Sequence, residues 1–131
     1  MKDIPLPDDQ GVLLEMYDSE QFSSDAIASF PELRAELVQN AGLLHVQMGT
    51  LATAVRKGIA SGDLVLALQV CVFLDTLLAN PRAHPEIENA VAISFLEAVE
   101  LRNTTAGRSF LDQLPARIRE ILREQEIRYG A

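Results

Sequence analysis

The segment from Leu64 to Ala79 constrains the fold more than any other, because apolar residues lie on almost every side of it. Drawn as a helix, it has only Gln69 and Thr76 to mark a polar edge. Its sixteen residues span about 24 Å at 1.5 Å per residue, short of a ~30 Å hydrocarbon core, and Asp75 lies inside the segment. We therefore predict a central, buried helix of a globular domain and no membrane span.

A second segment, from Leu43 to Ala60, has the clearest helical periodicity. Its apolar stripe comprises Leu44, Met48, Leu51, Val55 and Ile59. Steps of four, three, four and four place these side chains on one face of a helix and on no single face of a strand. Gly62 can take the left-handed conformation that ends such a helix, and Asp63 can cap the next one. The two segments predict a helical hairpin from Leu43 to Ala79.

A second helical hairpin is predicted from His84 to Tyr129. Asn80-Pro81 ends the preceding helix, and Pro85 suits the first position of the next one, with acidic residues in its first turn. The apolar stripe of that helix comprises Ile87, Val91, Phe95, Ala98 and Leu101. We expect a loop from Asn103 to Gly107, followed by a last helix that Pro115 either kinks or starts afresh.

The front of the chain contains weaker helix signals. Ser23–Asp25 has the residue types that cap a helix start, and Pro31 suits the first turn of another short segment. We therefore predict an all-α fold, a compact bundle of four main helices in two hairpins with one or two short N-terminal helices. With 131 residues the chain is expected to be a single domain, with an acidic lead-in over residues 1–22 and a helical core over residues 23–131.

The net charge of −8 is concentrated at the front of the chain. Met1 to Glu36 contain nine acids and two bases, whereas Leu101 to Ala131 contain four acids and six bases. Binding to phosphate requires clustered cations, so we exclude nucleic acid and anionic membrane surfaces as partners. The acidic front either complements the basic end within the fold, or is ordinary solvated surface, or faces a basic protein partner. The candidate partner-binding acids in this front are Asp8, Asp9, Glu15, Asp18, Glu20 and Asp25.

Residues suited to catalysis or metal binding are few. The single cysteine, Cys71, excludes an internal disulfide, and no Cys/His tetrad exists for structural zinc. No phosphate-binding glycine loop, Gly-x-Ser-x-Gly elbow or His-Glu-x-x-His helix occurs. We therefore predict no catalytic residue, no cofactor and no metal. The chain shows no secretory signal, so we expect a cytoplasmic location. We expect Cys71 to pack in the core and to be unreactive.

Two polar residues on apolar helix faces have alternative interpretations. Asp75 is in register with apolar residues of its helix, where a charge is costly unless it is paired or hydrated. It is either a structural carboxylate, paired with an arginine or capping a neighbouring helix, or a partner-binding residue beside a groove. His45, at the shoulder of its apolar stripe, is either a boundary histidine hydrogen-bonded within the fold or a general base or ligand. His84 is expected to cap a helix or to lie on the surface.

Four short motifs resemble a family of small bacterial helical proteins. They are Phe30-Pro31-Glu32-Leu33, Leu44-His45 with Met48, Gly62-Asp63, and Ser94-Phe95-Leu96-Glu97. More broadly, the size, acidity and predicted fold over Phe30 to Tyr129 are similar to those of immunity proteins that neutralise polymorphic or secreted bacterial toxins. This resemblance implies a stoichiometric inhibitor in the cytoplasm that occludes the active site of a toxin, and it implies no catalytic residue.

The function expected from these observations is protein binding. The leading prediction is an immunity protein whose acidic surface binds a cognate toxin with a basic cleft. A second prediction is a helical adaptor or assembly subunit that forms homo-oligomers through exposed apolar surface. A third is a small-ligand or enzyme domain with a pocket near His45 and Asp75.

Overall fold

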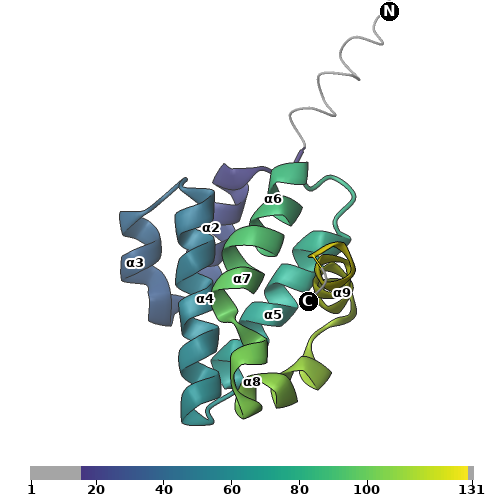
Figure 1. Ribbon diagram of the computed structural model, residues 1–131. Coiled ribbons are helices and arrows are strands. Elements are labelled where there is room, and N and C mark those ends of the chain that lie inside the picture. Colours follow the sequence, from purple (N-terminus) through teal and green to yellow (C-terminus); the bar gives the residue numbers. More distant parts are fainter. Residues whose placement is uncertain (1–15, 130–131) are drawn as a thin grey trace, which may run out of the picture.

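Helices make up the fold over the part of the chain that the structure, a computed structural model, describes, namely residues 16–129 (Figure 1). One isolated β-bridge, between Tyr17 and Ala83, is the exception within these residues. The all-α prediction is confirmed. The elements are α2 (Ser19–Ser29), the 3₁₀ turn η1 (Pro31–Leu33), α3 (Arg34–Gln39), α4 (Leu44–Ser61), α5 (Val65–Ala79), α6 (Pro85–Ala90), the π-helix η2 (Val91–Leu96), α7 (Glu97–Val99), the 3₁₀ turn η3 (Leu101–Asn103), α8 (Thr105–Phe110), the 3₁₀ turn η4 (Leu111–Gln113) and α9 (Ala116–Tyr129).

Helix α4 carries the apolar stripe that its sequence predicts. All five stripe residues are buried, and Met48 and Leu51 are completely inaccessible to solvent. The helix packs against α5, against η2 and α7, and against α2 and α3, so it contacts most of the bundle (Figure 1). Gly62, with a φ of +83°, ends α4 in the left-handed conformation, as predicted. The hairpin of α4 and α5 is therefore the scaffold on which the other elements pack.

Helix α5 is central but is not buried on every side. It packs against α4, α6 and α9, and its Phe73 ring contacts the rings of Phe22 and Phe30. The opposite face is exposed, with Val65 at 66% and Val72 at 57% exposure, because no described element covers it. Gln69 and Thr76, the predicted polar edge, are exposed as well, but the exposure of the two valines shows that the prediction of a buried helix is wrong for this face. No helix within residues 16–129 combines the length and the apolarity that a membrane span requires.

Helix α2 begins earlier than its sequence indicated. Asp18 is the N-cap, because its Oδ1 accepts a hydrogen bond from the Gln21 N–H at 3.0 Å. The Gln21 side chain in turn accepts a bond from the Asp18 N–H at 3.2 Å, which completes a capping box. The helix start predicted at Ser23–Asp25 is therefore wrong. Residues 19–22, which we assigned to the lead-in, belong to the helix, and Phe22 is fully buried.

The second half of the chain is less regular than predicted. Pro85 starts α6, as expected, but the helix then widens into the π-helix η2 and ends at Glu100, which has left-handed backbone angles (φ +53°, ψ +50°). The loop predicted from Asn103 to Gly107 is wrong, because Thr104 accepts a hydrogen bond from the Gly107 N–H and thereby caps α8. After Pro115, α9 starts afresh, which is one of the two predicted possibilities.

Candidate functional site

The carboxylate of Asp75 caps a neighbouring helix. Its Oδ1 accepts hydrogen bonds from the N–H groups of Arg117 (2.9 Å) and Ile118 (3.4 Å) in the first turn of α9. Its Oδ2 lies 3.5 Å from a guanidinium nitrogen of Arg117. Pro115, which precedes α9, has no side-chain acceptor, so a carboxylate from α5 satisfies these donors instead. Asp75 therefore has the structural role, which is one of the two interpretations that its sequence position left open.

Asp75→Ala is expected to lower the free energy of unfolding by about 1–2 kcal/mol, because α9 loses its cap and a favourable charge at its positive end. Asp75→Asn keeps an acceptor for the two N–H groups and is expected to cost less. Urea denaturation of both variants measures the difference. An alanine variant as stable as the native protein contradicts the capping role.

The two histidines have separate local roles. His45 on α4 forms a hydrogen bond between its Nδ1 and the Ser94 hydroxyl, which links α4 to η2. His84 caps α6, because its Nδ1 accepts a bond from the Glu86 N–H at 3.1 Å. His45 thus contacts η2 while Asp75 contacts α9, and the largest cavity described below is lined by neither residue. This cavity is therefore not the pocket that the sequence predicted near His45 and Asp75.

Three of the predicted partner-binding acids lie together on and beside the first turns of α2. They line a shallow hollow formed by Met16, Tyr17, Asp18, Glu20, Gln21, Ser24 and Asp25. The Tyr17 hydroxyl donates a hydrogen bond to Asp25 Oδ2 at 2.7 Å, and burial raises the pKa of Tyr17 above its ordinary value. Backbone hydrogen bonds to Arg82 and from His84, both at 2.7 Å, hold Tyr17 against the loop before α6. The hollow is therefore built on a fixed tyrosine.

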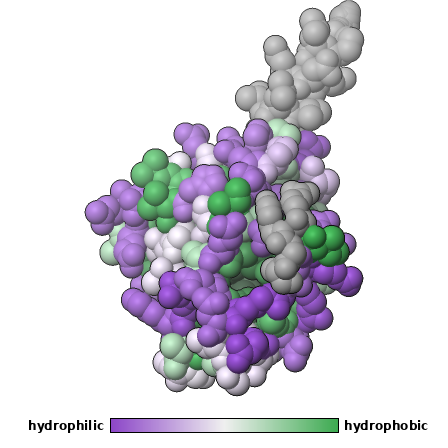
Figure 2. All heavy atoms as spheres, in the orientation of Figure 1, coloured by the Kyte–Doolittle hydropathy of each residue, from purple (hydrophilic) through white to green (hydrophobic). Residues whose placement is uncertain are grey.

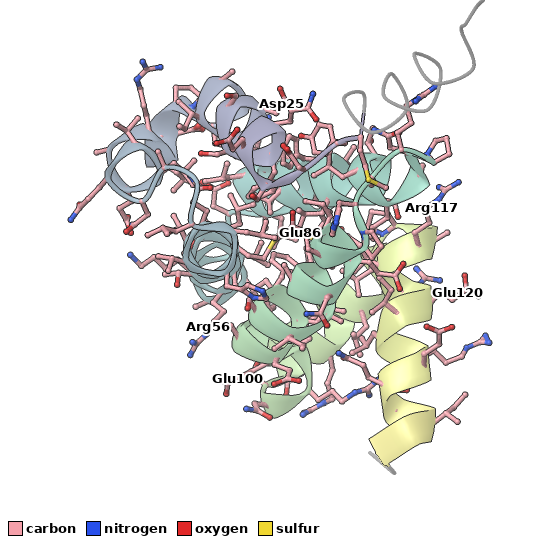
Figure 3. All side chains as sticks on the ribbon, turned by 90° about the horizontal axis from the view of Figure 1, so that it is seen from above. Asp25, Arg56, Glu86, Glu100, Arg117 and Glu120 are labelled. Atoms are coloured by element: carbon pink, nitrogen blue, oxygen red, sulfur yellow. The ribbon has the colours of Figure 1, made fainter. Side chains whose placement is uncertain are left out.

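These acids have no basic counterpart among the described residues. Among residues 16–127, whose side chains the structure describes, the ion pairs lie elsewhere, at Arg56–Glu100, His84–Glu86, Arg102–Glu126 and Arg117–Asp75. Figure 3 shows Asp25 on α2, on a different side of the molecule from Arg117 and Glu120 on α9. No described ion pair thus joins the acidic front to the basic end. The other predicted acids lie outside the described residues and are Asp8, Asp9 and Glu15.

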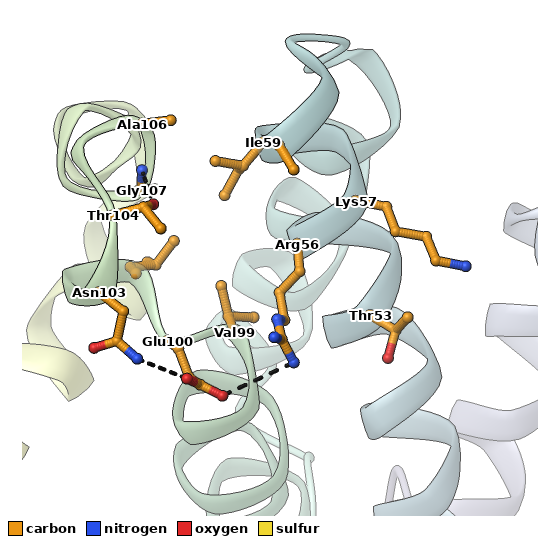
Figure 4. Close-up of a pocket in the computed structure, with 12 residues that line it drawn as sticks. Thr53, Arg56, Lys57, Ile59, Val99, Glu100, Asn103, Thr104, Ala106 and Gly107 are labelled. Atoms are coloured by element: carbon orange, nitrogen blue, oxygen red, sulfur yellow. Dashed lines mark hydrogen bonds and ion pairs between the residues drawn. The ribbon is translucent and has the colours of Figure 1, made fainter.

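A cavity of about 470 Å³ opens between α4 and the α7–α8 region, and its residues were not predicted as a site (Figure 4). Most of its wall is apolar, and three polar side chains meet at one end. There, Arg56 Nη1 lies 3.8 Å from Glu100 Oε2, and Asn103 Nδ2 donates a 2.6 Å hydrogen bond to Glu100 Oε1. The cavity therefore combines an apolar wall with one charged end.

Sequence reasoning missed this cavity because the residue that shapes it gives no local signal. Glu100 has the left-handed backbone that usually requires glycine or asparagine. Gly107 is the one available signal, since a Cβ atom there would lie 2.3 Å from the Leu101 carbonyl oxygen. A glycine in this position allows α8 to start very close to η3, but the sequence alone suggested only a loop.

In the described part of the chain, the residues that could bind a metal ion or act as a nucleophile do not come together in one site. Within residues 16–129, no three His, Cys, Asp or Glu side chains lie close enough together to hold a metal ion. Cys71 is fully buried, and its burial, with the charge of Asp75 adding to the effect, raises the pKa of the thiol to about 12. That the protein has no cofactor and is not an enzyme stays a prediction.

Comparison with known proteins identifies a family. Residues 24–130 match the family described as a domain of unknown function, DUF7674. No curated protein and no solved structure matches the chain. The family description assigns no activity, so the function has to be argued from the surface and the cavity of this chain.

Proposed function

The chain belongs to the DUF7674 family, and we propose that it is a protein-binding domain that uses the acidic surface of α2 to bind a basic protein. The observation that carries this proposal is the group of Asp18, Glu20 and Asp25, which line one hollow and pair with no described base. Residues 16–36 contain five acids and one base, so the potential over this surface is negative. Such a surface attracts a positively charged partner and accelerates association.

Tyr17 gives this acidic surface a partly apolar centre. Its ring is half-buried, and its position is held by the bond to Asp25 and by two backbone bonds. Tyrosine is enriched in protein interfaces, where the ring packs and the hydroxyl stays hydrogen-bonded. A fixed tyrosine beside carboxylates suits a partner that presents arginine or lysine, since these cations bind both the ring and the acids.

The particular form that we propose is a cytoplasmic immunity protein whose partner is a bacterial toxin with a basic cleft. Toxins that act on nucleic acids bind phosphate with clustered cations, and carboxylates on α2 can occupy the same positions. Asp8, Asp9 and Glu15 precede this surface in the chain and stay candidates for it. Asp75 is left out of the proposed surface, because it caps α9.

Exposed apolar side chains favour a second candidate function, assembly with further copies of the same chain. Figure 2 shows an apolar patch over the corner of α3 and α4. Val38, Leu43 and Val46 are 49%, 54% and 50% exposed there. Contiguous apolar surface of this kind favours association. Sedimentation of the purified protein tests it, and a monomer at every concentration excludes assembly through this patch.

Charge reversal on α2 tests the acidic-surface proposal, with the product of the neighbouring open reading frame as the partner. We expect Glu20→Lys combined with Asp25→Lys to weaken the complex at least about tenfold and to reduce the dependence of its affinity on salt. Asp18 is kept, because it caps α2. Glu97→Lys combined with Glu120→Lys makes the same change in charge on α7 and α9, and it is expected to leave the affinity within about twofold. Isothermal titration calorimetry at low and high NaCl measures both.

The outcomes of this experiment separate the general proposal from its toxin form. A complex whose affinity does not change with salt and tolerates the α2 reversal contradicts binding through the acidic surface. For the toxin form, the neighbouring gene expressed alone is expected to stop growth, and co-expression of this chain is expected to restore it. A neighbouring product that neither stops growth nor binds overturns the immunity role.

A further inference from the structure

The cavity between α4 and the α7–α8 region has the size and the lining of a small-molecule site. Its volume of about 470 Å³ falls within the ~300–1,000 Å³ typical of ligand pockets. Ile59 and Val99 point into it, and Leu101 and Ala106 extend the apolar wall (Figure 4). An apolar wall with a few polar groups at one end suits a ligand that has an aliphatic body and one polar end.

The polar end of the cavity contains an arginine whose hydrogen-bonding groups are largely unused. Arg56 Nη1 lies 3.8 Å from Glu100 Oε2, which is beyond hydrogen-bond distance, and the Arg56 guanidinium makes no hydrogen bond among the side chains described within residues 16–127. Glu100 is instead held by its 2.6 Å bond from Asn103. The Arg56 side chain is 53% exposed. Its guanidinium can therefore bind an incoming acceptor without first giving up a short bond.

The backbone around this end is held in unusual conformations. Glu100 is the one residue other than glycine with a positive φ within residues 16–129. The π-helix η2 ends four positions earlier, and such segments occur frequently at functional sites. Gly107 lets α8 begin against the Leu101 carbonyl, which closes one wall of the cavity. Strain that is retained beside a cavity is typical of sites whose geometry is set before a ligand binds.

We propose that this cavity binds a small amphipathic carboxylate, with its aliphatic chain against Ile59, Val99 and Leu101 and its carboxylate on Arg56. A guanidinium offers two parallel N–H donors to the two oxygens of a carboxylate. Lys57 also borders the cavity, although Figure 4 shows its side chain pointing away from Arg56. Lys57 therefore adds positive charge beside the cavity but makes no contact with its polar end, where Arg56 faces the single carboxylate of Glu100. The acidic surface of α2 plays no part here, so this inference does not depend on the proposed function.

Binding of decanoate to the full chain tests the inference, with 1-decanol and decylamine as probes of the same chain length and different charge. We expect decanoate to bind at least about tenfold more tightly than either probe, because neither offers Arg56 a pair of charged acceptors. Titration calorimetry gives the affinities, and NMR shifts of the Val99, Leu101 and Ala106 amides locate the site. Absence of decanoate binding, or equal binding of decylamine, overturns the inference.

Two substitutions test separately what the polar end and the apolar wall of the cavity contribute to binding. Arg56→Gln is expected to weaken decanoate binding at least about tenfold and to leave 1-decanol unchanged, whereas Arg34→Gln on α3 removes the same charge and is expected to change neither. Ala106→Leu fills the cavity and is expected to weaken both ligands, with Ala35→Leu on α3 as the matched control. All four positions are exposed, so the variants are expected to fold. Decanoate binding that survives both cavity substitutions overturns the proposed site.

Discussion

Gln47→Glu is expected to lower the free energy of unfolding by about 3–5 kcal/mol at neutral pH, although the two side chains have the same shape. Gln47 is fully buried, and its Nε2 donates to the Ser23 hydroxyl and to the Leu37 carbonyl, both at 2.9 Å. A carboxylate can donate to neither and places a negative charge beside a carbonyl oxygen. The Gln47 Oε1 atom has no hydrogen-bond partner within the described residues, so no donor there is available to the charge. Urea denaturation measures the loss.

The pH dependence of this loss is a second readout. Burial raises the pKa of the introduced carboxyl above the ~4.3 of glutamate in an unfolded chain, because the charged form loses its hydration and lies beside the Leu37 carbonyl oxygen, which cannot donate. The variant is therefore expected to lose stability as pH rises above about 4 and to recover it as the carboxyl is protonated in acid. Gln39→Glu, exposed on α3, adds the same charge and is expected to change stability by less than about 0.5 kcal/mol. Equal losses at the two positions contradict the buried network.

The Gln47 network also links the proposed partner surface to the scaffold. Ser23 belongs to α2, and its hydroxyl accepts hydrogen bonds both from Gln47 and from the Gly42 N–H at 3.0 Å. Gln47 at the same time holds the Leu37 carbonyl of α3. Gln47 therefore joins the start of α4 to α2 and α3, and Ser23 adds the loop between α3 and α4. Loss of the Gln47 side chain is therefore expected to loosen the helix that presents Glu20 and Asp25.

Apolar periodicity was sufficient to predict the main helices. The stripe of α4 is buried at every predicted position, and α5 and α6 begin within one residue of the predicted starts. The reason is that burial of a helix face repeats every three or four residues, so the pattern can be read without knowing the neighbouring element. The exposed face of α5 was missed for the same reason, because periodicity does not show which side of an apolar helix lacks a neighbour.

Polar residues within helices could not be assigned from local sequence. Ser23–Asp25 contains helix-capping residue types, yet Ser23 is buried in the interior of α2 and bonds to another helix. Asp75 caps α9 across 42 positions in the chain. Gln47 gave no sign of burial, because glutamine is usually exposed. In each case the partner is distant in sequence, so the role of the residue depends on the packing of the helices.

The candidate sites were predictable to different degrees. The acidity of the front was visible in the charge count, but the hollow depends on Tyr17, which is placed by its β-bridge to a loop some 65 positions away. The cavity depends on the left-handed backbone of Glu100, and glutamate has no preference for that conformation. Charge can be counted from the composition, whereas the hollow on α2 and the cavity beside α4 both depend on backbone geometry.

Alkaline pH is expected to destabilise the native protein through Cys71. Burial, with a smaller effect from the charge of Asp75, raises the pKa of this thiol from 9.0 to about 12. In the unfolded chain the thiol ionises near pH 9, so above that pH the unfolded state releases a proton that the folded state retains. The contribution to stability is complete below about pH 9 and falls by about 3 kcal/mol by pH 11.

Cys71→Ala isolates this contribution, because it removes the thiol and keeps every other titrating group. Burial also raises the pKa of Tyr17, so the native protein and the variant share that part of the alkaline loss. The variant is expected to be less stable at about pH 8, where it has a small cavity, but to lose about 3 kcal/mol less between about pH 8 and pH 11. Cys71→Ser fills the same space and repeats the comparison if alanine unfolds the protein. Urea denaturation measures the free energy of unfolding of both proteins against pH. If the two profiles are parallel, the Cys71 thiol does not stay protonated in the folded core.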